Sequence, residues 1–75
     1  MSAEEMISVD AEICSGKPVV RGTRILVRNV LGIFAGGGTI DDVLEAYPEL
    51  NEEQVRAAVE YAVRVLDEEK VLLID

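Results

Sequence analysis

The stretch Leu50–Glu69, with the sequence LNEEQVRAAVEYAVRVLDEE, decides the fold of this chain. Asn51 is a favourable N-cap residue, and Gln54 follows it at the spacing of a capping box. Leu50 and Val55 stand on either side of the cap, where two apolar side chains form a hydrophobic staple. The sequence therefore predicts a helix that begins directly after Asn51 and runs to the end of the stretch.

Apolar side chains recur along this helix every three or four positions, which places them on one face. They are Val55, Ala58, Val59, Ala62, Val63 and Leu66. A stripe more than three turns long predicts that the helix packs lengthwise against the rest of the domain.

Two shorter helices are predicted upstream from the same helical spacing. The first carries Val27, Val30, Leu31 and Phe34, and the second carries Ile40, Val43, Leu44 and Tyr47. Glycines 36–38 end the first helix, because three glycines cost too much conformational entropy to continue it. Thr39 is the expected N-cap of the second helix, and Pro48 ends it.

The segments outside these helices are predicted to be extended. Residues 6–26 contain short β-branched runs and turn signals, which favour an extended arm or a small hairpin. Residues 70–75 form an apolar tail that does not continue the stripe, and we interpret it as a strand or plug. The prediction is one mainly α domain over residues 1–75, with a three-helix body at 27–69. The short turn before the last helix is typical of a helix-turn-helix, with that helix in the recognition position.

The small size of the chain favours self-association. A domain of this length buries only about 60% of its unfolded surface, so it usually needs a disulfide, a metal or a partner chain. A single cysteine excludes an internal disulfide, and the absence of histidine argues against a zinc site. We therefore expect a homodimer without metal or cofactor. The absence of a secretory signal and of a membrane-spanning run predicts a cytoplasmic protein with no membrane partner.

Charge is strongly polarised along the chain. The net charge is −8, yet residues 13–40 contain four bases and no acid, whereas residues 1–12 and 41–75 are acidic. Asymmetry of this kind indicates two different kinds of partner surface.

The predicted binding residues lie in this basic segment. They are Lys17, Arg21, Thr23, Arg24 and Arg28. Arg21 and Arg24 flank a Gly-Thr turn, from which two guanidinium groups can project and bind phosphate or carboxylate. Such an arm suits either a DNA minor groove or an acidic pocket on a protein. The alternative is that these residues bind no partner and are solvated charges that offset the acidic body.

An enzyme is the least favoured class. No histidine is present to shuttle protons near neutral pH. Cys14 has no histidine partner, and Gly16-Lys17 lacks the other residues of a phosphate-binding loop. The paired acids are adjacent on helices and so do not face each other.

Three stretches together resemble a family of short bacterial and archaeal proteins catalogued as domain of unknown function 433. They are GKPVVRGTRI at 16–25, DDVLEAYP at 41–48 and LNEEQV at 50–55. The resemblance covers roughly residues 7–63. Leu26 stands where the family often has Pro, and the glycines at 36–38 replace a less flexible connection.

The resemblance implies a VapB-type antitoxin with a homeodomain-like helix-turn-helix fold. Such a protein neutralises a PIN-like nuclease toxin and represses its own operon by binding operator DNA. Because these nucleases hold metal in a cluster of acids, an arginine on the arm could pair with the cluster and displace metal or substrate. The alternative is a stand-alone protein-interaction module, or a regulator without DNA binding. It is supported by the acids Glu52 and Glu53 at the start of the last helix.

Overall fold

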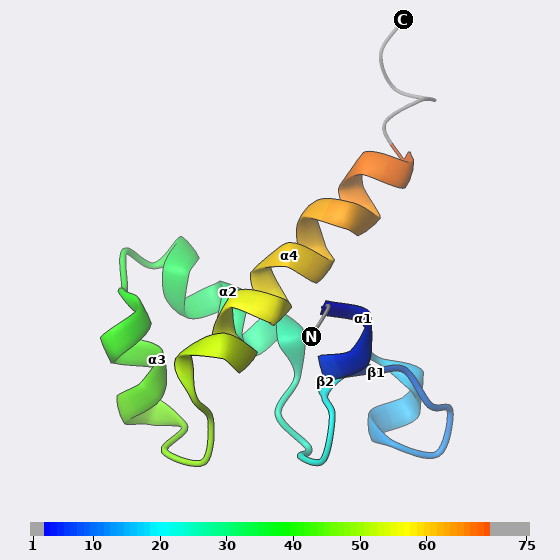
Figure 1. The fold of residues 1–75 in the computed structure, drawn as a ribbon, viewed down its shortest axis with the longest axis horizontal. Helices are drawn as coiled ribbons and strands as arrows, with labels where there is room; N and C mark the ends of the chain where they lie inside the picture. Colours follow the sequence, from blue (N-terminus) through cyan, green and yellow to red (C-terminus); the bar gives the residue numbers. More distant parts are fainter. Residues whose placement is uncertain (1–2, 70–75) are drawn as a thin grey trace, which may run out of the picture.

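The computed structural model describes residues 3–69. Its helices and strands follow in the order α1 (Ala3–Met6), β1 (Ile7–Ser8), a 3-10 turn (Cys14–Gly16), β2 (Val19–Val20), α2 (Val27–Ala35), α3 (Ile40–Ala46) and α4 (Glu52–Glu69) (Figure 1). The chain is mainly helical, with three helices after a two-stranded antiparallel hairpin near the N-terminus, as predicted. The predicted tail at 70–75 lies outside the described residues.

The N-terminal arm is a hairpin whose strands pair Ile7 with Val20 and Ser8 with Val19. Ile7, Val19 and Val20 are buried, so β-branched side chains fix the register by facing the core. One feature was not predicted: residue 6 closes a single helical turn, α1, instead of opening the strand. A four-residue helix carries too few side chains to show a period, and α1 packs on α4, far along the chain.

Helix α2 ends where the glycines were predicted to stop it. The backbone N–H of Gly38 donates to the Ile33 carbonyl at 2.8 Å, which folds the chain back over the last turn. A Cβ on Gly38 would lie 2.6 Å from Cγ2 of Ile33, a distance that real side chains do not reach. Gly37 adopts a φ of +93°, a conformation that favours glycine. The glycines therefore make both the stop and the tight turn into α3.

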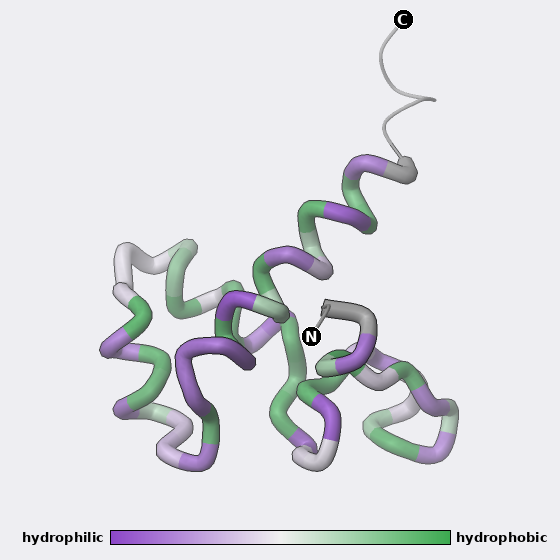
Figure 2. Tube along the Cα trace, viewed as in Figure 1, coloured by the Kyte–Doolittle hydropathy of each residue, from purple (hydrophilic) through white to green (hydrophobic). Residues whose placement is uncertain are grey.

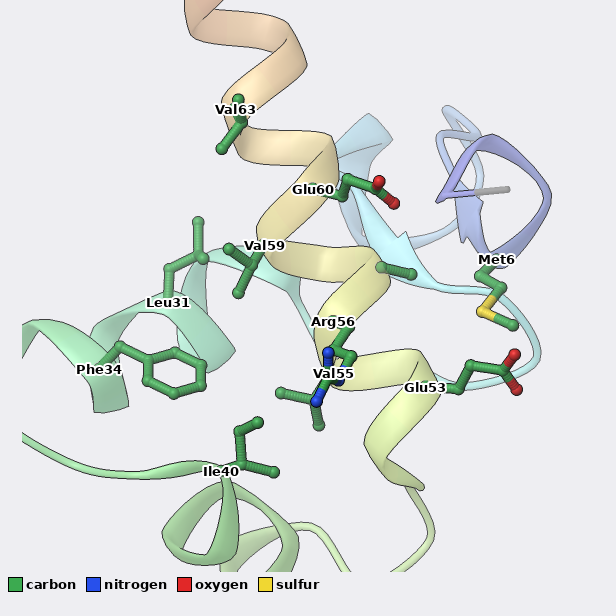
Figure 3. Close-up of a pocket in the computed structure, with 11 residues that line it drawn as sticks. Met6, Leu31, Phe34, Ile40, Glu53, Val55, Arg56, Val59, Glu60 and Val63 are labelled. Carbon is green, nitrogen blue, oxygen red and sulfur yellow. The ribbon is translucent and has the colours of Figure 1, made fainter. Parts of the chain in front are cut away.

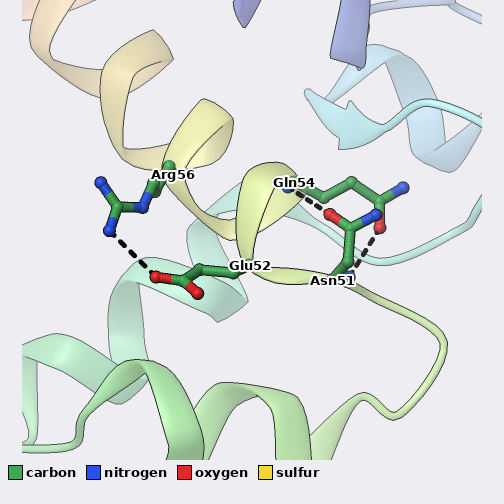
Figure 4. A network of polar contacts seen from close by, with 4 residues as sticks. All are labelled: Asn51, Glu52, Gln54 and Arg56. Carbon is green, nitrogen blue, oxygen red and sulfur yellow. Dashed lines mark hydrogen bonds and ion pairs between the residues drawn. The ribbon is translucent and has the colours of Figure 1, made fainter.

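Both predicted caps are present and are reciprocal. Thr39 Oγ1 accepts the Asp42 N–H at 3.2 Å, and the Asp42 carboxylate accepts the Thr39 N–H at 2.9 Å. At the start of α4, Asn51 and Gln54 exchange the same pair of bonds at 2.8 and 2.9 Å (Figure 4). Each cap satisfies backbone N–H groups that a helix start otherwise leaves without partners.

The core is built mainly from valines contributed by every major element. Val20, Val30, Val43 and Val55 are completely buried, and Leu50 packs in the same cluster as Val55, as expected for the staple. The first half of α4 contacts this body, whereas its second half projects away from it (Figure 1). Hydrophobic and hydrophilic residues nevertheless continue to alternate along the projecting half (Figure 2). No helix within residues 3–69 is long and apolar enough to cross a membrane.

Candidate partner-binding surface

The turn after β2 is closed by Thr23. Its hydroxyl donates to the Val20 carbonyl at 2.7 Å and accepts the Ile25 N–H at 3.0 Å. The Val20 N–H donates to the Ile25 carbonyl at 3.0 Å, so a backbone hydrogen bond also joins the two sides of the turn. Thr23 was predicted among the binding residues, and the structure gives it a place in the turn itself.

The two arginines on this turn have different surroundings. The Arg21 guanidinium donates from Nε to the Glu5 carbonyl at 2.6 Å and from Nη2 to the Ile7 carbonyl at 3.2 Å. Arg21 therefore ties the start of β1 to the end of β2. The Arg24 side chain is exposed and makes no hydrogen bond or ion pair within the described chain. Of the pair that was predicted to project together, Arg24 alone is unengaged.

Lys17 and Arg28 are brought together by a contact between the arm and α2. The Val27 N–H donates to the Pro18 carbonyl at 3.0 Å, and this bond brings Lys17 close to Arg28. Both cations are exposed, and their side chains have no partner among residues 3–69.

These two cations flank a groove of about 440 Å³ that we call the arm-side groove. It is lined by Lys17, Pro18, Val27, Arg28, Leu31, Tyr61, Ala62, Val65 and Leu66. The groove runs between the start of α2 and the projecting half of α4. Apolar side chains flanked by unpaired cations can bind a segment that combines apolar and acidic residues.

A second groove lies on the other side of Leu31, and we call it the α3-side groove. It has a volume of about 800 Å³, and its apolar side chains come from α1, α2, α3 and α4 (Figure 3). They are Met6, Leu31, Phe34, Ile40, Val55, Ala57, Val59 and Val63. Arg56 and Glu60 also line it, and no unpaired lysine or arginine of the arm reaches it.

The exposed surface of α3 and of the first turn of α4 is acidic. Asp41, Asp42 and Glu45 lie on α3, and Glu52 and Glu53 open α4; all five are exposed. The Arg56 guanidinium is bonded to the Glu52 carboxylate at 2.9 Å (Figure 4), so the first base of α4 is already paired. Such a surface repels a phosphate backbone.

The described residues form no cluster of metal ligands, and the one thiol lies in a loop. Within residues 3–69 no three acidic, cysteine or histidine side chains group as metal ligands. The Cys14 thiol is half-buried and lies 3.8 Å from the Arg24 carbonyl, as a weak donor. Cys14 and Ser15 have φ values of 50° and 60°, a left-handed pair that shapes the loop leading to Lys17.

Sequence reasoning found the cations but missed what lies between them. Lys17 and Arg28 were predicted from spacing in the basic segment, whereas Tyr61, Val65 and Leu66 come from α4, more than 30 residues later. Leu66 was assigned to the apolar stripe of the last helix, and Tyr61 is not part of that stripe. No local signal could show that both border one groove.

The fold is that of a small, mainly helical domain with an N-terminal hairpin arm. The family model described as "Protein of unknown function (DUF433)" matches residues 7–62, so the chain belongs to the DUF433 family. The chain is also 41% identical over 61 residues to "Uncharacterized protein y4eO" of Sinorhizobium fredii (strain NBRC 101917 / NGR234). That match covers 81% of this chain and 28% of the relative, so the chain spans under a third of its length. No solved structure matches.

Proposed function

We propose that the protein is an antitoxin-like binding module whose arm-side groove docks an acidic, partly apolar segment of a protein partner. The observation that carries this proposal is the placement of Lys17 and Arg28. Both cations lack an ion pair within residues 3–69, and they border apolar side chains of α2 and α4. In a chain of net charge −8, unpaired bases beside an apolar surface select an acidic partner.

A PIN-like nuclease toxin is the partner that the antitoxin resemblance implies. Its metal-binding acids offer the carboxylates that an exposed guanidinium binds in bidentate form. Arg24 is the residue that we assign to this contact, because its side chain is unengaged. Arg21 supports the contact by holding the hairpin together through its bonds to two backbone carbonyls.

Repression through operator DNA is the second candidate, and the unpaired bases Lys17, Arg24 and Arg28 favour it. A homeodomain-like helix-turn-helix would use α3 and α4 for this purpose, with α4 in the major groove. The exposed acids of α3 and of the first turn of α4 oppose that use, because each of them repels phosphate. We therefore rank protein binding above DNA binding.

The test compares the charge-reversed variant Lys17→Glu/Arg28→Glu with the charge-preserving variant Lys17→Arg/Arg28→Lys. Each is tagged and used to capture protein from lysate of the source organism, and the captured proteins are quantified by mass spectrometry. We expect a small PIN-like protein with the wild type and the charge-preserving variant, and at least tenfold less with the reversed one. Equal capture by all three, or capture of no PIN-like protein, would show the proposal to be wrong.

A gel shift with the DNA upstream of the gene, at about 50 mM salt where phosphate contacts are strongest, addresses the second candidate. If the protein only binds partners, the wild type does not shift the DNA. A shift that is lost in Lys17→Glu/Arg28→Glu and weakens steeply with salt would reverse our ranking.

A further inference from the structure

The arm-side groove is mainly apolar, and part of its α4 wall is exposed to solvent. This wall consists of Tyr61, Ala62, Val65 and Leu66. Leu66 is 66% exposed, although it belongs to the apolar stripe of the helix. The two charged residues that line the groove are Lys17 and Arg28, and neither has an ion pair within residues 3–69. The groove therefore fits a segment that is mainly apolar and carries an acid.

The apolar tail at 70–75, with the sequence KVLLID, has this composition. Four large apolar residues follow Lys70, and Asp75 comes directly after them. Water disfavours an exposed apolar run of this kind, so an apolar surface that can receive it stabilises it. The run does not continue the stripe of α4, and it therefore needs a surface other than the one that the stripe covers.

The tail is long enough to reach the groove of its own chain. The described part of α4 ends at Glu69. Along the helix axis, Glu69 and Tyr61 are separated by about 12 Å. The five residues at 71–75 span about 16 Å when they are extended. A turn at Lys70 therefore lets Asp75 reach the level of Tyr61, where α4 borders the same groove as the two cations.

Charge distinguishes the arm-side groove from the α3-side groove as the place for this tail. Three charged residues line the α3-side groove: Glu53, Arg56 and Glu60. The one base among them, Arg56, is already bonded to Glu52 at 2.9 Å. An acid placed there meets like charges, whereas in the arm-side groove it meets two unpaired cations. Arg64 and Asp67, farther along α4, line neither groove.

We infer that the apolar tail folds back and docks in the arm-side groove of its own chain, with Asp75 against Lys17 and Arg28. The run at 71–74 then covers the exposed side of Leu66. Because the tail offers the same chemistry as an acidic, partly apolar partner segment, such a partner has to displace it. This displacement rests on the proposed function, whereas the docking itself does not.

Nuclear Overhauser contacts in the full chain test the docking. They are expected between the methyl groups at 71–74 and both the Tyr61 ring and the Val65 methyl groups. Absence of these contacts, or contacts to Val59 in the α3-side groove instead, overturns the inference. In an equal mixture of isotope-labelled and unlabelled protein, the contacts should arise only within one chain. Contacts between a labelled and an unlabelled chain would place the tail in a second copy and overturn docking within one chain.

Charge reversal tests the position of Asp75. Asp75→Lys should weaken the contacts about threefold or more, because it brings a base against Lys17 and Arg28. Asp75→Glu is the matched control and should keep the contacts. Combining Asp75→Lys with Lys17→Glu/Arg28→Glu should restore them. Contacts that are as strong in Asp75→Lys as in the wild type overturn the assignment of Asp75 to the two cations.

Capture from lysate tests the displacement. Two aspartates in the apolar run make its burial unfavourable, so Leu72→Asp/Leu73→Asp leaves the groove open. This variant is expected to capture about threefold more of the PIN-like protein than the wild type, because no tail competes for the groove. Equal or lower capture overturns the displacement. Absence of capture by both proteins overturns the proposed function, and the Overhauser contacts still decide the docking.

Discussion

In the first half of α4 the stripe residues Val55 and Ala58 are completely buried, whereas in the second half Val63 and Leu66 are more than half exposed. The spacing of apolar residues is the same in both halves. In the first half the stripe meets α1, α2 and α3, and in the second half no described element covers it. Periodicity therefore reports that a helix has a face for packing, but not whether its own chain supplies the packing.

The same contrast separates the two arginines of the arm. Arg21 is bonded to two carbonyls of the N-terminal segment, whereas Arg24 has no side-chain partner in residues 3–69. They are three residues apart and belong to one motif, GKPVVRGTRI. Arg21 holds the arm together, whereas Arg24 is unengaged and is the residue that we propose contacts a partner.

Replacing a valine by alanine in each half of the stripe should give the largest difference in the free energy of unfolding. Val55→Ala is expected to lower the free energy of unfolding by roughly 2 kcal/mol or more, because it leaves a cavity in a fully packed core. Val63→Ala should change it by less than about 0.5 kcal/mol, since the side chain is mostly exposed. Urea denaturation of both variants measures these changes. Equal losses would show that the second half is covered within the monomer.

Removing each arginine should separate stability from binding. Arg21→Ala is expected to cost roughly 1–2 kcal/mol, because two carbonyls near the arm lose a charged donor. Arg24→Ala should leave the thermal midpoint unchanged and reduce capture of the PIN-like partner. The measurement is thermal denaturation by circular dichroism beside the capture experiment. A stable Arg21→Ala protein would mean that the arm is held by its hairpin bonds alone.

Loss of the Asn51 cap should have a smaller effect on the free energy of unfolding, but it should destabilise the whole domain. Asn51→Ala removes the side chain that accepts the Gln54 N–H, at a cost of about 1 kcal/mol. Because the cap belongs to the buried half of α4, the loss should appear in global unfolding, and hydrogen exchange near Val55 should accelerate with it. Faster exchange confined to the first turn of α4 would contradict this expectation.

The sequence predicted the elements whose signals are local. The Thr39 and Asn51 caps, the glycine stop and Pro48 fixed the limits of α2, α3 and α4 to within a residue, because each acts on its own turn. Helix α1 was missed because it is a single turn that packs on a distant helix.

The candidate site could be predicted only in part, for the same reason. Lys17, Arg24 and Arg28 were found from charge, but the role of Arg21 depends on carbonyls 14 and 16 residues away in the sequence. Likewise, the groove beside Lys17 is completed by Tyr61 and Leu66 of α4. Such contacts follow from the tertiary arrangement and leave no trace in local spacing.

The smallest effect on the monomer is expected at the ion pair between Arg56 and Glu52. Both side chains are well exposed, at 69% and 56%, so Arg56→Ala should change the monomer's free energy of unfolding by less than about 0.5 kcal/mol. Urea denaturation measures this difference. A loss above about 1 kcal/mol would contradict this expectation and would show that the pair helps to hold the start of α4 in place.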